Sequence, residues 1–300
     1  MTELEQVRSQ MTAPQADEER LKQYPVKRQE KSSIPTRHGQ TAIYIYEPLP
    51  CADTPQGKLP VLVNFHGGGF VKGYQAKFMV YGRILASKGA CLVVDVDYRL
   101  APEYPYPCAL EEGWDVVRYL RQHSSDFGID PDRMVLCGQS SGGNLATVLA
   151  MKMKKAGEPL PSGIISCYPP YDLYQDPAQK AQDKGIEPND FILQGRLYNQ
   201  WYVGDGDSRD IYISPVFAAQ KDLEGLPPFT IIAGGEDFLC PDAMTFASLL
   251  MEAGVTVTVK KVKGAQHGFL VRRTEGHEEG NRLLFQTLKE YFSLSHPSSF

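Results

Sequence analysis

The architecture of this chain is indicated most clearly by one stretch of eleven residues, Met134-Val135-Leu136-Cys137-Gly138-Gln139-Ser140-Ser141-Gly142-Gly143-Asn144. An apolar run enters it, and an Ala/Leu/Met-rich run leaves it, which predicts a strand, a sharp turn and a helix. The centre is the pattern Gly-x-Ser-x-Gly, in which a strained turn lifts the Ser140 hydroxyl above the sheet and glycines avoid collisions with neighbouring backbone. The pattern predicts a nucleophilic serine. The alternative is a glycine-rich turn with Ser140 or Ser141 as helix cap.

Composition limits the classes of protein to consider. The chain has 300 residues, a net charge of −5 and six cysteines, none in a C-x-x-C pair. No basic block favours nucleic-acid binding, and no apolar run approaches the roughly 18 residues of a membrane span. The N-terminal 30 residues lack the apolar core of a signal peptide. We therefore expect a cytoplasmic protein with reduced thiols and without membrane or nucleic-acid partners. Its oligomeric state stays open, with a homodimer as one alternative.

Strand and helix patterns alternate along most of the chain, which predicts a mostly parallel central sheet with helices on both faces. An edge strand is expected at 41–46. The further predicted strands are 61–65, 91–96, 134–137, 164–167, 229–233 and 255–262. The predicted helices are 77–88, 110–122, 145–155, 189–202, 242–253 and 278–292.

Two segments depart from this alternation. Residues 169–213 contain no strand candidate and are rich in tyrosine, so we expect an insertion that caps the site. Residues 1–40 are expected to form a helical N-terminal segment, with helices up to about residue 30, that contributes to the same cap. Residues 41–300 then form one α/β domain carrying the insertion.

Polar groups follow the strand ends, where open α/β sheets place their sites. A hydroxyl nucleophile needs a base, and the base needs an orienting acid. His267, between Gly264 and Gly268 after the last strand, is the predicted base. Asp237 is the predicted acid, with Glu236 as the alternative. Both follow Ser140 in the order nucleophile, acid, base that α/β-hydrolases use.

A run of glycines supplies a further part of the predicted site, in His66-Gly67-Gly68-Gly69-Phe70. Acyl transfer passes through an oxyanion that needs preorganised N–H donors, and we expect these from Gly68, Gly69 and Ser141. His66 and Gly67 are expected to support the loop.

Several other side chains have two readings. Asp97, Arg99 and Glu103 are either substrate ligands or, as we favour, a buried supporting network. Five aromatic side chains either line a substrate pocket or belong to the core: Phe70, Tyr168, Tyr171, Trp201 and Tyr202. Asp242 is expected to cap the helix that follows it.

These motifs together resemble the hormone-sensitive-lipase-like esterases, bacterial esterase family IV. The resemblance spans roughly residues 60 to 275 and rests on four segments: His66 to Phe70, Asp97 to Glu103, Gly138 to Ala146 and His267 to Phe269. Trp201-Tyr202 and Ser214-Pro215 also resemble the family pattern. Gln139 and Ser141 stand where the family usually has aspartate and alanine, and Phe238 stands where it usually has proline.

The resemblance implies an α/β-hydrolase core, a helical cap and carboxylesterase activity on short acyl esters, without a metal or organic cofactor. It gives Ser140 the role of nucleophile, His267 that of base and Asp237 that of acid. A peptidase or amidase on the same core is one alternative. A non-catalytic small-molecule receptor is another, which the presence of His267 disfavours.

Overall fold

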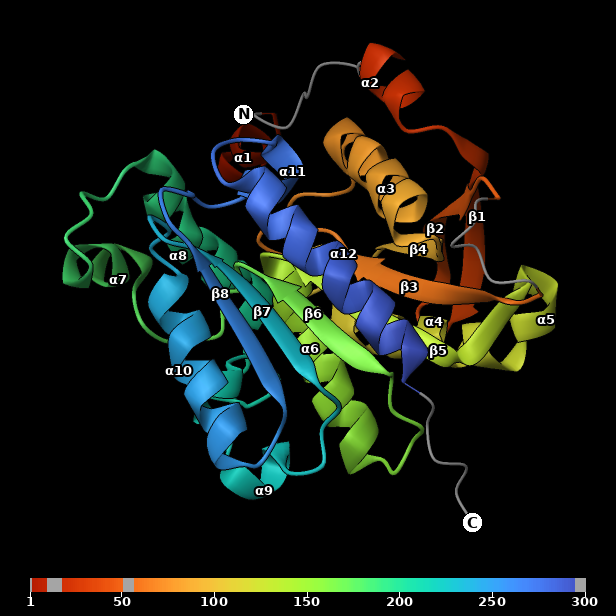
Figure 1. The fold of residues 1–300 in the computed structure, drawn as a ribbon. Coiled ribbons are helices and arrows are strands. Elements are labelled where there is room, and N and C mark those ends of the chain that lie inside the picture. The colour runs from red at the N-terminus through yellow and green to blue at the C-terminus, as the bar shows by residue number, and fades with distance from the viewer. Residues whose placement is uncertain (1, 10–17, 51–56, 295–300) are drawn as a thin grey trace.

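The structure, a computed structural model, describes residues 2–9, 18–50 and 57–294 (Figure 1). Cys51, one of the six cysteines of the chain, lies outside these residues.

A single eight-stranded sheet forms the centre, in the order β1-β2-β4-β3-β5-β6-β7-β8. The pairs β1–β2 and β2–β4 are antiparallel, and the other pairs are parallel. The strands are β1 Val26–Thr36, β2 Gly39–Pro48, β3 Leu59–Phe65, β4 Leu92–Asp97, β5 Ile129–Gln139, β6 Gly163–Cys167, β7 Phe229–Gly234 and β8 Val257–Val262. This is the predicted mostly parallel sheet of an α/β fold.

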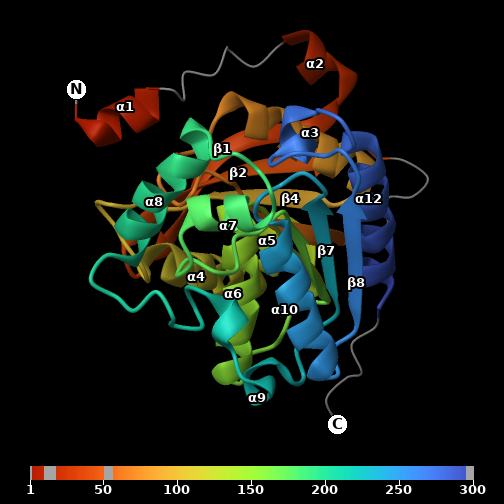
Figure 2. The ribbon, with the colours of Figure 1, turned by 90° about the vertical axis from the view of Figure 1, so that its left-hand side faces the viewer.

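Helices cover both faces of the sheet (Figures 1 and 2). The core on one side contains α3 and α12, and the core on the other contains α4, α6 and α10. Successive side chains of a strand enter opposite cores, as Leu62 and Val63 do. The helices are α1 Glu3–Ser9, α2 Glu18–Gln23, α3 Ala76–Gly89, α4 Cys108–Gln122, α5 Ser124–Phe127, α6 Ser141–Lys155, α7 Pro177–Asp183, α8 Asp190–Val203, the 3-10 helix η1 Pro215–Phe217, α9 Gln220–Leu223, α10 Cys240–Glu252, α11 Phe269–Arg272 and α12 His277–Ser293.

The N-terminal part of the sheet corrects two predictions. The segment expected to be helical up to about residue 30 becomes a strand at Val26, and this strand, β1, forms the edge of the sheet. The predicted edge strand, β2, therefore lies inside the sheet, between β1 and β4. The reason is burial: β1 exposes most of its side chains and buries only Ile34, so it lacks the apolar alternation that identifies a strand.

The segment between β6 and β7 contains no strand, as predicted, and holds α7 and α8 before η1 and α9. The predicted helix at 189–202 is α8, shifted by one residue, whereas α7 was not predicted. Figure 2 faces the side of the molecule on which α7 and α8 lie in front of the sheet.

Candidate active site

Strand register brings the candidate loops together. Phe65 pairs with Gly138, so the glycine-rich loop after β3 starts beside the turn after β5. Gly234 pairs with Val262, so the loops that carry Asp237 and His267 also start side by side. Parallel pairing thus places four loops at one edge of the sheet.

Ser140 lies in the sharp turn between β5 and α6, with a φ of 55° and a ψ of −122°. A left-handed φ is rare for a residue with a side chain and indicates local strain. A Cβ at Gly138 would come within 2.0 Å of the Gly142 carbonyl oxygen, and a Cβ at Gly142 within 1.9 Å of the Phe65 oxygen. The turn can therefore form only with glycine two residues before and two residues after the serine, as the sequence predicted.

His267 connects Ser140 to Asp237. Its Nε2 lies 2.9 Å from Ser140 Oγ, and its Nδ1 lies 2.7 Å from Asp237 Oδ2. Asp237 is 2% exposed, and its other oxygen accepts a hydrogen bond from the Leu239 amide at 3.0 Å. With Nδ1 donating to the carboxylate, Nε2 is the nitrogen that can take the serine proton. Glu236, the alternative acid, is exposed to solvent.

Aromatic rings surround this imidazole. The ring centroids of Tyr168, Phe191 and Phe238 lie 5.2, 5.4 and 6.2 Å from that of His267. The His267 side chain is 13% exposed as a result. Partial exclusion of water strengthens the polar contacts of the site.

The glycine-rich loop presents backbone amides to the same space. Gly68 and Gly69 have φ values of 143° and 63°, which suit glycine. The Gly68 carbonyl accepts from the Val71 and Lys72 amides, which fixes the turn. Among the described residues, no acceptor is bound to the amides of Gly68, Gly69 or Ser141. They are free to bind an incoming oxyanion.

His66 supports this loop from below and does not line the cavity. It is fully buried and stacks on Tyr98, with centroids 4.3 Å apart. Its Nδ1 lies 2.9 Å from the Gly67 carbonyl oxygen, and the Tyr98 hydroxyl donates to the His66 carbonyl at 2.7 Å. Burial lowers the pKa of His66, which favours a neutral ring.

A cavity of about 160 Å³ opens at Ser140 and His267. Two of the predicted pocket residues, Phe70 and Tyr168, line it. The other three do not. The Tyr171 hydroxyl bonds to Thr147 in the core, Tyr202 stacks on Phe70, and Trp201 packs against the core. The lining side chains that were not predicted include Lys72, Lys77, Phe78, Asp172, Lys180, Phe191, Tyr198, Phe238, Leu239 and Arg272.

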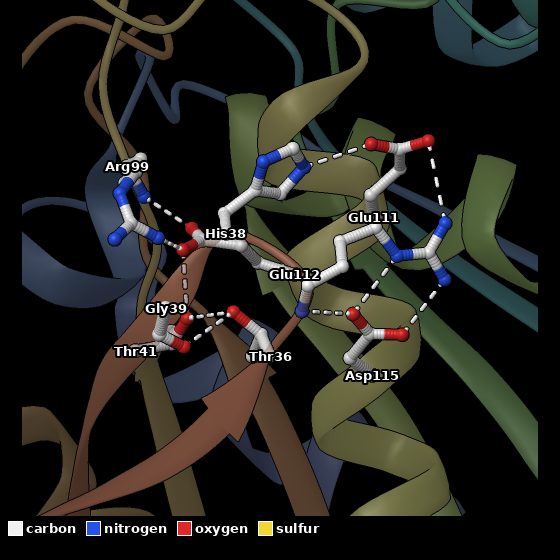
Figure 3. Close-up of polar contacts among 9 residues, drawn as sticks. Thr36, His38, Gly39, Thr41, Arg99, Glu111, Glu112 and Asp115 are labelled. Carbon is white, nitrogen blue, oxygen red and sulfur yellow. Dashed lines mark hydrogen bonds and ion pairs between the residues drawn. The ribbon is translucent and has the colours of Figure 1, made fainter.

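Arg99 belongs to a supporting network, as favoured from the sequence. It forms an ion pair with Glu112, which is fully buried and also accepts from Thr41 (Figure 3). Beside this pair, Arg37 in the β1–β2 turn donates to Asp115 on α4. The network fastens β2, the loop after β4 and α4 to one another.

Asp97 and Glu103 also lie outside the cavity lining. Asp97 Oδ1 is 3.8 Å from His66 Nε2. Glu103 receives two hydrogen bonds from Arg8 of α1, at 2.7 and 2.8 Å, and Arg8 also donates to the carbonyl of Val71. The N-terminal helix is therefore fastened next to the glycine-rich loop.

Gln139, which precedes the candidate nucleophile, is part of a buried polar chain. Its Nε2 donates to Asn64 Oδ1 at 2.8 Å, and Asn64 donates to the Asp95 carboxyl group. The Tyr74 hydroxyl donates to the other Asp95 oxygen at 2.7 Å. Burial raises the Asp95 pKa to about 7 despite these hydrogen bonds.

Asp242 does not cap its helix. Helix α10 begins at Cys240 with Leu239 as its N-cap, and the Asp242 carboxylate instead accepts hydrogen bonds from Lys180 and from the amides of Tyr171 and Asp172. This contact joins α10 to α7 and to the start of the segment after β6.

The described cysteines at 91, 108, 137, 167 and 240 are free thiols. Across residues 2–9, 18–50 and 57–294, no three histidine, cysteine, aspartate or glutamate side chains gather as a metal site would require. None of the described helices has the length and apolar character needed to cross a bilayer.

An elbow serine at the carboxyl end of a central parallel strand, in a sheet of this topology, defines an α/β-hydrolase. The family model of the α/β hydrolase fold matches residues 62–271. The chain belongs to this family, in its hormone-sensitive-lipase-like branch.

Individual relatives agree with that assignment. Esterase LipI of Mycobacterium tuberculosis is 32% identical over 232 residues, which are 77% of this chain and 72% of LipI. An arylesterase of Saccharolobus solfataricus is 30% identical over 233 residues, covering 76% of this chain and 72% of that protein. The hyperthermophilic esterase of the archaeon Pyrobaculum calidifontis superposes with a TM-score of 0.83 at 28% identity, covering 96% of this chain and 94% of the other.

Proposed function

We propose that the protein is a serine carboxylesterase that hydrolyses short-chain acyl esters through Ser140, His267 and Asp237. The observation that carries the proposal is the double contact of His267, 2.9 Å from the serine oxygen and 2.7 Å from the aspartate oxygen. The esterases among its relatives agree with the reaction class. A cavity of about 160 Å³ suits a short acyl group.

Acylation begins when Ser140 Oγ attacks the ester carbonyl carbon and its proton passes to His267 Nε2. Asp237 holds the imidazole in the required tautomer and stabilises the imidazolium. The amides of Gly68, Gly69 and Ser141 bind the oxyanion, and one such donor lowers the barrier by about 3 kcal/mol. His267 then protonates the leaving alkoxide as the carbon–oxygen bond breaks.

Deacylation repeats the sequence with water. His267 takes a proton from the water as its oxygen attacks the acyl-enzyme, and it returns that proton to Ser140 Oγ as the acid leaves. The chemistry needs no metal or organic cofactor.

The cap in this proposal consists of residues 169–213 together with α1. Tyr198 of α8 supports this role, because a Cβ at Gly69 would come within 2.5 Å of the Tyr198 ring. Arg8 of α1 donates to the Val71 carbonyl at 3.1 Å, next to the same loop. Both segments therefore contact the loop that is proposed to bind the oxyanion.

The test is hydrolysis of p-nitrophenyl esters from acetate to decanoate, with Ser140→Ala as the variant. Turnover is expected to be greatest for short chains and to disappear in Ser140→Ala, with an unchanged circular dichroism spectrum. Undiminished turnover in Ser140→Ala would remove Ser140 as nucleophile. Faster cleavage of an aminoacyl nitroanilide would favour an amidase, and ligand binding without turnover of any substrate would favour a receptor.

A further inference from the structure

Four basic side chains line the cavity that contains Ser140 and His267, and three of them lack an acidic partner among the described residues. Lys72 follows the glycine-rich loop, Lys77 lies in the first turn of α3, and Arg272 ends α11. Within the described part of the chain, none of the three forms an ion pair or donates a hydrogen bond. Three separate segments thus bring unpaired cations to one cavity.

Aromatic faces are the contacts that these cations do make. Lys72 Nζ lies 5.4 Å from the ring centroid of Tyr198, and Arg272 Cζ lies 5.8 Å from that of Phe191. Both rings belong to α8. Cations over ring faces are held in place but keep their hydrogen-bond donors free.

This placement is unfavourable for folding. Burial and the positive charges of Arg272 and Lys72 lower the pKa of Lys77 to about 8, and burial and Arg272 lower that of Lys72. Lys77 also sits at the positive end of the α3 helix dipole, where an acidic residue would be stabilising. A contribution to folding stability therefore does not explain why three unpaired cations line this cavity.

The remaining charged groups of the lining do not neutralise them. Lys180 is paired with Asp242. Asp172, the lining carboxylate, accepts hydrogen bonds from the amides of Tyr174 and Gln175 through one oxygen. One carboxylate against three unpaired cations leaves the cavity with excess positive charge.

We propose that the preferred substrates are esters that carry an anionic group, such as a carboxylate, which Lys72, Lys77 and Arg272 bind while Ser140 attacks the ester carbonyl. The inference rests on the proposed esterase function and names the substrate class of the same site. Charge-assisted hydrogen bonds to a carboxylate are stronger than neutral ones, and a partly enclosed cavity screens them less than open solvent does. A neutral ester of the same length makes none of these contacts.

The first experiment compares a matched pair of substrates, mono-4-nitrophenyl glutarate and 4-nitrophenyl valerate. These have acyl chains of equal length and differ in a terminal carboxylate. We expect a higher kcat/KM for the glutarate ester, with a preference that falls as sodium chloride is raised from 20 to 500 mM, because salt screens charge attraction. Equal kcat/KM for the two esters at low salt, or a preference for valerate, would exclude recognition of an anion in the acyl part of the substrate and leave the esterase function standing.

Variants then assign the preference to these side chains. In Lys77→Met and Lys72→Met, the ratio of kcat/KM for glutarate over valerate is expected to fall about tenfold, which corresponds to about 1.4 kcal/mol. Lys77→Arg is expected to retain it. Lys88→Met is the matched control, because Lys88 is exposed at the other end of the same helix. An equal fall in kcat/KM for the glutarate and valerate esters would show that the lysine has a general role, such as oxyanion stabilisation, and would contradict anion recognition.

A third arm locates the anion within the substrate. 4-Butyryloxybenzoate carries its carboxylate on the alcohol side, and its neutral match is the 4-tolyl ester of butyric acid. A preference in this pair alone would place the recognised anion in the alcohol part, and a preference in the glutarate pair alone would place it in the acyl part. No preference in either pair would overturn the proposal.

Binding to Ser140→Ala keeps the inference testable if no ester is turned over. Calorimetry with monoethyl glutarate and ethyl valerate measures recognition without chemistry. Tighter binding of the anionic ester, lost with Lys77→Met in the same background, would support the cationic cavity even if the esterase function failed. Equal binding would contradict it.

Discussion

Lys180 of α7 and Asp242 of α10 form a buried ion pair, with Lys180 Nζ 2.6 Å from Asp242 Oδ2 and their side chains 3% and 5% exposed. The same carboxylate accepts hydrogen bonds from the amides of Tyr171 and Asp172, at 3.1 and 3.0 Å. Lys180 also donates to the Asp172 carbonyl. The Asp242 side chain therefore holds both the start of the segment after β6 and α7, the first helix of that segment.

Lys180→Met is expected to lower the free energy of unfolding by about 3 kcal/mol at pH 8, because it leaves a buried carboxylate without its counter-charge. Burial already raises the Asp242 pKa to about 6 with the lysine in place. Urea unfolding followed by circular dichroism measures the loss.

The control is Lys180→Met combined with Asp242→Asn, which removes the charge but keeps an acceptor for the two amides. The double variant is expected to recover most of the lost stability. If the double variant lost as much stability as Lys180→Met and Asp242→Asn lose separately when summed, the pair would contribute no coupling energy.

Asp242 also shows where sequence reasoning stops. An aspartate near a predicted helix start suggests a cap, but the actual partner is 62 residues away, and no local pattern encodes it. The prediction for β1 was wrong for a related reason, because its exposed side chains do not show the apolar alternation that identifies a strand. By contrast, Ser140, Asp237 and His267 each follow a strand of the parallel part of the sheet, so strand order alone indicated that they would lie at one edge.

The cavity lining was harder to predict than the proximity of these three side chains. Aromatic side chains in a cap segment face either the cavity or the core, and only packing decides, as Tyr198 and Tyr202 on α8 illustrate. The cations of the lining come from three segments that the sequence does not connect.

Gly69→Ala is expected to lower kcat/KM for p-nitrophenyl acetate at least tenfold. Its Cβ would lie 2.5 Å from the Tyr198 ring, so either the loop or α8 must shift, and small displacements of oxyanion donors are costly. The positive φ of 63° adds roughly 1 kcal/mol of strain.

Gly157→Ala separates these two effects, because Gly157 has a similar φ of 68° with nothing within 4 Å of a Cβ. It is expected to lose comparable stability and retain its kinetics. If both alanine variants keep full activity, contact between the loop and α8 has no part in catalysis.

Arg8→Met is expected to release α1 from the body of the protein. Arg8 makes two hydrogen bonds to Glu103 and one each to the carbonyls of Val71 and Ala101. Hydrogen exchange of the amides in residues 3–9 should become faster, while exchange in the central strands stays unchanged. Unchanged protection of α1 would mean that burial of Val7, 3% exposed, suffices to hold it.

The ion pair between Arg8 and Glu103 makes the hydrogen-exchange protection of α1 depend on pH. The Arg8 guanidinium lowers the pKa of Glu103, so the contribution of this pair is present above the ordinary glutamate pKa and is lost as pH falls through the lowered value. Protection of α1 in the wild type is expected to weaken with acidification toward that value, and Arg8→Met is expected to show no such trend.

Asp95 is expected to make stability fall as pH rises, which is the opposite sign. Its folded-state pKa of about 7 lies above the ordinary aspartate value of 3.8, so between these values the folded protein keeps a proton that the unfolded chain has lost. Each pH unit in that window then costs about 1.4 kcal/mol of unfolding free energy, and the loss is complete above pH 7.

Asp95→Asn removes the titrating group but keeps an oxygen for Asn64 or Tyr74. Unfolding free energies from pH 4.5 to 8.5 should therefore show the variant gaining on the wild type up to pH 7 and then running parallel, since all other groups titrate in both proteins. A difference that is flat across this range would show that Asp95 is already ionised in the folded protein, with the hydrogen bonds from Asn64 and Tyr74 offsetting its burial.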